Sequence, residues 1–138
     1  MTRSSSPPRR GFTLLEVLIV LALGALLLAV ALPAYQGTVR QTRRSEAFDA
    51  AAGVLQAQER WRGNQATYTG RLADLSTAAT TAGGLYALAL SNAGDAGYTL
   101  TLTGVAGKSQ AADSGCTVLT VTVANGDPAY APATCWKR

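Results

Sequence analysis

The chain has 138 residues, which is enough for one small domain together with a long helix. Its net charge of +4 falls to +1 once Arg3, Arg9 and Arg10 are set aside, so its basicity does not indicate a nucleic-acid-binding surface. It contains no histidine, no glycine-rich phosphate loop and no paired-carboxylate motif. The sequence therefore predicts no catalytic residues, no cofactor, no metal and no enzymatic activity.

An apolar run over residues 12–32 is interrupted only by Thr13, Glu16 and Gly24. A helix of roughly 20 apolar residues is long enough to cross the hydrocarbon core of a bilayer. Glu16 is unusual in such a helix, because a carboxylate near the bilayer centre costs roughly 2.5–3.5 kcal/mol and tends to be functional and paired. The run therefore predicts a membrane-spanning helix with one acidic residue of special importance.

Two cleavage sites are compatible with this run. A secretory signal would be cut beside small residues at its end, such as the Ala-Val-Ala of residues 29–31. A cut between Gly11 and Phe12 would instead leave a new amine one helical turn from Glu16. In a filament, that amine could pair with the carboxylate of a neighbouring subunit. Hydropathy alone leaves both interpretations open.

Basic residues before the apolar run favour a cytoplasmic N-terminus, so the chain after residue 32 should face the periplasm or the outside. Cys116 and Cys135 then lie where disulfides persist. Eighteen residues separate them, and closing such a loop would stabilise the fold by about 3 kcal/mol in the chain-entropy model. A metal pair is the alternative, but the chain has no Cys-x-x-Cys spacing. A structural disulfide is favoured.

Beyond the apolar run, Pro33 should bend a helix because it removes one backbone hydrogen bond, and Gly24 is a second weak point. A buried stripe at spacings of three and four then predicts an amphipathic helix. Its residues are Ala47, Phe48, Ala51, Val54, Leu55, Gln58 and Trp61. Residues 63–65 should end this helix, and a loop over residues 64–84 should hold a short helix around residues 72–79.

Three strands are predicted next, at residues 85–91, 98–103 and 116–124, the last two with alternating apolar side chains. Turns are expected at residues 92–97 and 125–128. The strands suggest an antiparallel meander of at least three strands, covered by the helix stripe, with residues 129–138 returning along the sheet edge. The fold class is therefore α+β.

The N-terminal motif identifies a family. The segment GFTLLE at residues 11–16, the apolar run and LPAYQ at residues 32–36 together resemble the N-terminus of type IV prepilins. The resemblance implies that a prepilin peptidase cuts after Gly11 and that Phe12 is then N-methylated. It also implies that Glu16 pairs with the N-terminal amine of a neighbouring subunit during assembly. Gly24 stands one place before the family's usual glycine, which leaves the cleavage motif unchanged.

Segments at residues 56–62, 66–70, 98–103 and 133–136 extend the resemblance, more loosely, to the PilE-type minor pilins. It implies the type IV pilin fold, a long N-terminal helix packed on a small antiparallel sheet with a disulfide-bounded C-terminal region. Its parts would be a removed leader (residues 1–11), a transmembrane or filament-core helix (12–36) and a periplasmic head (37–138). Cys116 and Cys135 match the paired C-terminal cysteines of many pilins.

The function that the resemblance implies is that of a structural subunit of type IV pili, a minor pilin that initiates the filament or is incorporated in it for adhesion and twitching motility. The expected partners are prepilin peptidase, major and minor pilins, the inner-membrane assembly platform and inner-membrane lipids. The expected location is the inner membrane before assembly and the extracellular pilus afterwards. Alternatives are a type II secretion pseudopilin, a DNA-binding pilin of natural transformation and a plain membrane-anchored periplasmic protein.

Two basic clusters are candidates for contacts with nucleic acid or lipid. The C-terminal cluster consists of Trp136, Lys137 and Arg138. Such residues can stack on bases and bind phosphates, but a packed Trp beside two solvated charges is the preferred interpretation. Arg40, Arg43 and Arg44 follow the apolar run closely, where lipid head groups or helix solvation account for them.

Overall fold

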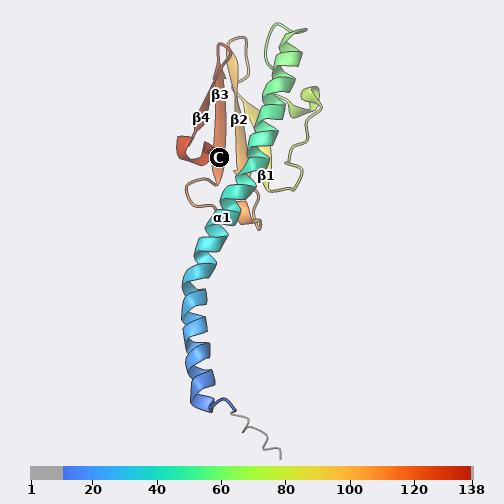
Figure 1. The fold of residues 1–138 in the computed structure, drawn as a ribbon. Helices are drawn as coiled ribbons and strands as arrows, with labels where there is room; N and C mark the ends of the chain where they lie inside the picture. Colours follow the sequence, from blue (N-terminus) through green and yellow to red (C-terminus); the bar gives the residue numbers. More distant parts are fainter. Residues whose placement is uncertain (1–10, 138) are drawn as a thin grey trace, which may run out of the picture. The chain divides into compact units, whose positions relative to one another are not determined.

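The long helix α1, Leu14–Arg62, contributes its second half to a helix-on-sheet domain (Figure 1). The structure is a computed structural model that describes residues 11–137. The sheet contains β1 (Tyr86–Ser91), β2 (Gly97–Gly104), β3 (Val118–Ala124) and β4 (Asp127–Ala131), all antiparallel and adjacent in chain order. By internal contacts the chain divides into two units, Met1–Gln36 and Gly37–Arg138. The predicted α+β fold is confirmed.

The start of α1 is set by Thr13, whose hydroxyl oxygen accepts the backbone N–H of Glu16 at 3.2 Å. This bond satisfies one of the first-turn donors that have no partner inside the helix. The chain stays helical through Gly24 and Pro33. A bend at these two residues remains a prediction.

One face of α1 is buried against the sheet. The buried residues of α1 are Ala47, Ala51, Val54, Ala57 and Gln58. Four of these five were predicted from the helical spacing, whereas Phe48, Leu55 and Trp61 are only partly buried. Ala57 was missed because one small residue carries little periodic signal in an alanine-rich helix. Three alanines in the stripe let the helix backbone come close to the sheet.

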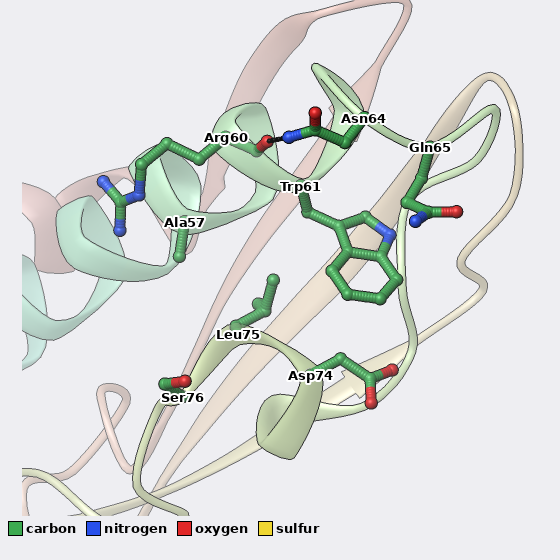
Figure 2. A pocket seen from close by; sticks show the side chains of 8 residues that line it. All are labelled: Ala57, Arg60, Trp61, Asn64, Gln65, Asp74, Leu75 and Ser76. Carbon is green, nitrogen blue, oxygen red and sulfur yellow. Dashed lines mark hydrogen bonds between the residues drawn. The ribbon is translucent and has the colours of Figure 1, made fainter.

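The predicted end of α1 is confirmed, since its last helical residue is Arg62. The side-chain amide of Asn64 donates to the Arg60 carbonyl at 3.4 Å (Figure 2), and the Asn64 backbone N–H donates to the Trp61 carbonyl at 3.0 Å. These bonds satisfy carbonyls that the last turn of a helix leaves without partners.

Alternation along β2 and β3 builds the inner face of the sheet. Leu100 of β2 lies opposite Val121 of β3, and Leu102 lies opposite Leu119. All four are fully buried, and they form one core with the buried face of α1. The threonines between them are partly or fully exposed, as expected for a sheet with one buried face.

The C-terminal part of the sheet differs in detail from the prediction. The turn after β3 contains only Asn125 and Gly126, both with positive φ (52° and 88°), so Asp127 and Pro128 already belong to β4. Two such residues form the tight turn whose twist matches a hairpin. Pro128 is accepted because β4 is an edge strand, where a missing N–H breaks no further ladder.

Two other expectations about the loops need correction. The short helix expected around residues 72–79 is a single 3-10 turn, Leu72–Leu75, ended by Ser76 in the left-handed region (φ 53°). β3 begins at Val118 instead of residue 116, because the backbone N–H of Cys116 donates to the Asp113 carbonyl at 2.8 Å. The residues before β3 therefore form a loop.

Candidate functional site

The N-terminal half of α1 is apolar and exposed. Phe12 is 82 % exposed, Leu14 80 % and Leu27 71 %, and the other large apolar side chains up to Leu32 are also exposed. Within residues 11–137, α1 is the helix that is long and apolar enough to cross a membrane, judged by length and composition. A surface this apolar indicates a lipid or protein environment.

Two of the predicted assembly residues lie together in this segment. Phe12 and Glu16 line the same shallow apolar cavity of about 250 Å³, with Val17, Val20 and Leu21. The Glu16 carboxylate makes no hydrogen bond or ion pair inside the described part of the chain. Gly11, the predicted cleavage residue, directly precedes Phe12 at the exposed start of this segment. The carboxylate is thus available to an external cation.

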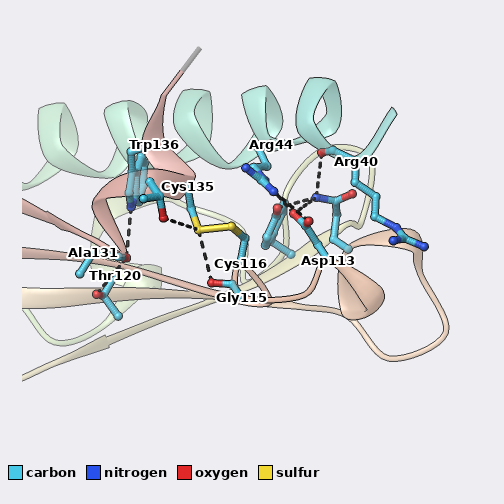
Figure 3. Close-up of a disulfide and its surroundings, with 12 residues drawn as sticks. Arg40, Arg44, Asp113, Gly115, Cys116, Thr120, Ala131, Cys135 and Trp136 are labelled. Carbon is cyan, nitrogen blue, oxygen red and sulfur yellow. Dashed lines mark hydrogen bonds and ion pairs between the residues drawn. A yellow bond between two sulfur atoms is a disulfide. The ribbon is translucent and has the colours of Figure 1, made fainter. Parts of the chain in front are cut away.

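In the head, Arg44 of α1 forms an ion pair with Asp113 from the loop before β3. Arg44 Nε donates to Oδ2 of Asp113 at 2.7 Å and Nη2 donates to Oδ1 at 2.9 Å (Figure 3). The side chains are only 15 % and 7 % exposed. The hydrogen bond to Asp113 raises the pKa of Arg44, although burial opposes the rise. The expectation that Arg44 serves lipid head groups or solvation was wrong, because its guanidinium is used inside the fold.

Gln110 connects this ion pair to the sheet. Its buried amide donates to the Tyr86 hydroxyl at 2.7 Å and to the Arg40 carbonyl at 3.3 Å. Arg43 donates from Nη1 to the Ser109 hydroxyl at 2.8 Å. The residue 109–113 segment therefore binds the helix turn that carries the three arginines. No local sequence signal pointed to this contact, because the partners are about 70 residues apart in the chain.

The predicted disulfide is confirmed. Cys116 and Cys135 are joined with an S–S length of 2.02 Å and a Cα–Cα distance of 5.7 Å, and both are buried (Figure 3). The bond ties the C-terminal 3-10 turn Ala133–Trp136 to the loop that leads into β3. The C-terminal region is thus held by a covalent link as well as by the sheet edge.

Trp136 of the C-terminal cluster is used in packing. Its ring stacks on Phe48 of α1 with centroids 5.1 Å apart and meets the edge of Tyr130 at 4.9 Å. Its indole N–H donates to the Ala131 carbonyl at 3.1 Å. Lys137 is exposed, and Arg138 lies outside the described residues. The packing of Trp136 agrees with the preferred interpretation, and Lys137 is the exposed member of this cluster in the described part of the chain.

Polar side chains of α1 also hold the loop after the helix. The Gln58 side-chain amide donates to the Thr69 carbonyl at 2.7 Å and accepts the Thr69 N–H at 3.2 Å. It thus satisfies both backbone groups of Thr69, as the backbone of a paired strand does in a sheet. The Glu46 carboxylate accepts the Gly83 N–H at 2.9 Å. Over residues 11–137, no group of three or more His, Cys, Asp and Glu residues could hold a metal ion.

Comparison with known proteins matches both parts of the chain. Residues 33–120 fit the profile of a family described as "Type IV minor pilin ComP, DNA uptake sequence receptor". Residues 7–32 fit the "Prokaryotic N-terminal methylation motif". The first match covers more than half of the chain.

Two curated relatives are fimbrial proteins. Fimbrial protein EcpC of Eikenella corrodens is 39 % identical over 75 residues, which are 54 % of this chain and 49 % of that protein. A fimbrial protein of Moraxella nonliquefaciens is 48 % identical over 46 residues, 33 % of this chain and 30 % of that protein. The matched segments span about half or less of these relatives' length. With its methylation motif, its long apolar helix and its disulfide-bounded antiparallel sheet, the chain belongs to the ComP-like family of type IV minor pilins.

Proposed function

We propose that this chain is a structural subunit of a type IV pilus, present as a minor component that helps initiate the filament or is incorporated in it. The observation that carries the proposal is the position of Glu16. It is a single acid in an exposed helix segment that is otherwise apolar, and this segment begins directly after the glycine of the methylation motif. An isolated carboxylate in such a segment is costly in lipid and gains a partner in a filament.

Assembly would begin with processing. A prepilin peptidase would cut between Gly11 and Phe12, and Phe12 would then be methylated on its new amine. This methylated amine would remain a cation, so that it could pair with the Glu16 carboxylate of the next subunit. Each subunit would then exchange lipid contacts for helix contacts. In this scheme the chain is the substrate of an enzyme and not itself an enzyme.

The proposed topology follows the charge of the leader. Residues 1–11 would be the leader, residues 12–36 the membrane and filament-core helix, and residues 37–138 the periplasmic head. Arg9 and Arg10 would keep the leader in the cytoplasm. The inner-membrane assembly platform and other pilins would be the partners, and the extracellular filament would be the final location.

The substitution Glu16→Gln tests the pairing mechanism, because it removes the charge and keeps the shape. We expect the variant to insert in the membrane as well as the wild type but to be lost from filaments sheared from cells, measured by immunoblot of both fractions. The control is Asp95→Asn, since Asp95 is an exposed acid of the head. Normal incorporation of the Gln variant would overturn the role of Glu16.

A second candidate function is DNA binding by the head, and the description of the matched family as a DNA uptake sequence receptor favours it. The exposed Lys137 would supply a phosphate contact together with Arg138. The ring of Trp136 packs against Phe48 and Tyr130, so it does not serve as a stacking surface for a base in this structure.

An electrophoretic shift of duplex DNA by the full chain in detergent tests this second function. If the C-terminal cations bind phosphate, the double variant Lys137→Ala, Arg138→Ala should bind more weakly and with a smaller dependence on salt concentration. Lys108→Ala is the matched control, because Lys108 is an exposed cation before a different turn. Equal shifts by all three proteins would place any DNA site elsewhere.

A further inference from the structure

A cavity of about 340 Å³ lies beside the C-terminal end of α1, between the helix and the loop that follows it (Figure 2). The indole of Trp61 and the side chain of Leu75 provide its apolar wall. Leu75 is 9 % exposed, and Trp61 is partly buried against the core, so both are held by packing. The volume is in the range of small-ligand pockets.

Polar side chains around the same cavity retain unused hydrogen-bonding groups. Asp74 Oδ2 accepts a bond from the Thr69 hydroxyl at 2.6 Å and its Oδ1 lies 3.7 Å from Arg71 Nε, but the side chain is 24 % exposed and its oxygens can accept further bonds. Asn64 uses one amide donor within the helix end. The side chains of Gln65 and Arg60 make no hydrogen bond within residues 11–137. A carboxylate and two carboxamides thus lie around an aromatic wall, whereas the Arg60 guanidinium extends away from the indole (Figure 2).

We propose that this cavity binds a neutral saccharide. A pyranose ring has an apolar C–H face, which suits the indole of Trp61, and a rim of hydroxyls that both donate and accept. The Asp74 carboxylate can accept from such a hydroxyl, and the amides of Asn64 and Gln65 can do both. The charge of Asp74 is offset by Arg71, whose Nε lies 3.7 Å from its Oδ1, and the Arg60 guanidinium points away from the indole (Figure 2), so an anionic ligand would gain little.

A second cavity next to the first would extend the proposed saccharide site along α1. It has a volume of about 330 Å³ and shares Ala57, Arg60, Leu75 and Ser76 with the first. The shared lining places the two cavities next to each other along α1. A disaccharide should therefore bind more tightly than its monosaccharide.

The saccharide site is separate from the assembly residues. It lies wholly within the Gly37–Arg138 unit and uses none of Gly11, Phe12 and Glu16. Binding can be measured without a filament, so its failure would leave the proposed assembly function untouched, and failure of assembly would leave this site untouched.

Fluorescence of Trp61 in the full chain, kept in a sugar-free detergent, tests the proposal. The background substitution Trp136→Phe leaves Trp61 as the single tryptophan. The probes are cellobiose, lactose and N,N′-diacetylchitobiose, with glucuronate and inorganic phosphate as anionic comparisons. We expect a saturable change with at least one neutral disaccharide and a dissociation constant in about the millimolar range, as small ligands of shallow sites give.

Variants locate the site. Gln65→Ala and Asp74→Asn should each weaken binding by about fivefold, the effect of losing one hydrogen bond. Gln65 is exposed and without hydrogen bonds in the described chain, so its loss should not disturb folding. Gln56→Ala, on an exposed part of α1 outside the cavity, should bind like the parent. No saturation with any disaccharide, equal binding by all variants, or tighter binding of glucuronate or phosphate would each overturn the proposal.

Discussion

Arg44 and Asp113 form an ion pair that is largely shielded from solvent. Removing one partner therefore leaves the other as a buried charge without a counter-ion. The two side chains are 15 % and 7 % exposed, and two hydrogen bonds join them. A buried pair of this kind contributes little compared with a well-packed apolar pair, but breaking it is costly. The same pair fixes the residue 109–113 segment on α1.

Asp113→Ala should therefore lower the free energy of unfolding of the head by about 3 kcal/mol, because it leaves an uncompensated guanidinium. Thermal unfolding followed by circular dichroism in detergent measures this loss. The double variant Arg44→Met, Asp113→Leu should recover most of it, since no charge is left unpaired. A single variant as stable as the wild type would show that solvent reaches the pair freely.

Two buried tyrosines allow a matched comparison. The Tyr98 hydroxyl is buried with no hydrogen-bond partner in the described chain, whereas the Tyr86 hydroxyl accepts a bond from Gln110 at 2.7 Å. Tyr98→Phe should therefore be neutral or stabilise by about 1 kcal/mol, and Tyr86→Phe should destabilise by about 1 kcal/mol. Unfolding of both variants at neutral pH checks the signs. Equal losses would contradict the assigned contacts.

The same tyrosines predict how stability depends on alkaline pH. Burial raises the pKa of Tyr98 and of Tyr86 above the ordinary value of 10.0. Because the folded pKa lies above the unfolded value, the stabilisation is complete below about pH 10 and is lost as the pH rises toward the folded pKa. Tyr98→Phe should move the midpoint of alkaline unfolding to higher pH, as measured by circular dichroism. An unchanged midpoint would mean that other groups control it.

Among the elements, the C-terminal turn depends on the disulfide for its position. β4 is an edge strand with exposed residues throughout, so few apolar contacts hold the chain that follows it. The link from Cys135 to Cys116 ties this turn to the loop before β3, and the ring of Trp136 packs on α1 beside it. The disulfide and the aromatic stack together hold the C-terminal turn in place next to the edge strand β4.

Removing the bond by Cys116→Ala and Cys135→Ala should lower the free energy of unfolding by about 3 kcal/mol, the value for a loop of this size. Chemical unfolding with and without reductant measures the loss. Reductant should destabilise the wild type to a similar degree and have no effect on the double variant. A wild type that is insensitive to a reductant shown to open the bond would contradict this role.

The elements also show which features local sequence can predict. The end of α1 at Arg62 and the alternation of β2 and β3 depend on neighbouring residues, and these predictions were correct, as were four residues of the buried stripe. The pairing of Arg44 with Asp113 joins residues 69 positions apart in the chain. The local sequence around Asp113 does not indicate which basic residue it contacts. The start of β4 was misplaced because Asp127 and Pro128 have turn composition but pair with β3.

The whole molecule consists of an exposed apolar helix segment and a head with its own core. The head has its own core, which contains the buried face of α1 and all the buried apolar strand residues. The segment before Gly37 has apolar side chains without cover in the single chain. Under the proposed function, this surface would be buried first in lipid and then among other subunits.

Mass spectrometry of filaments sheared from the cell surface tests most directly whether the chain is processed and enters a pilus. We expect a chain that begins at methylated Phe12 and is much less abundant than the major subunit. The same processed chain confined to membranes would contradict incorporation and favour a pseudopilin. An unprocessed chain, or one cut after Ala31, would contradict processing between Gly11 and Phe12 and with it the proposed assembly.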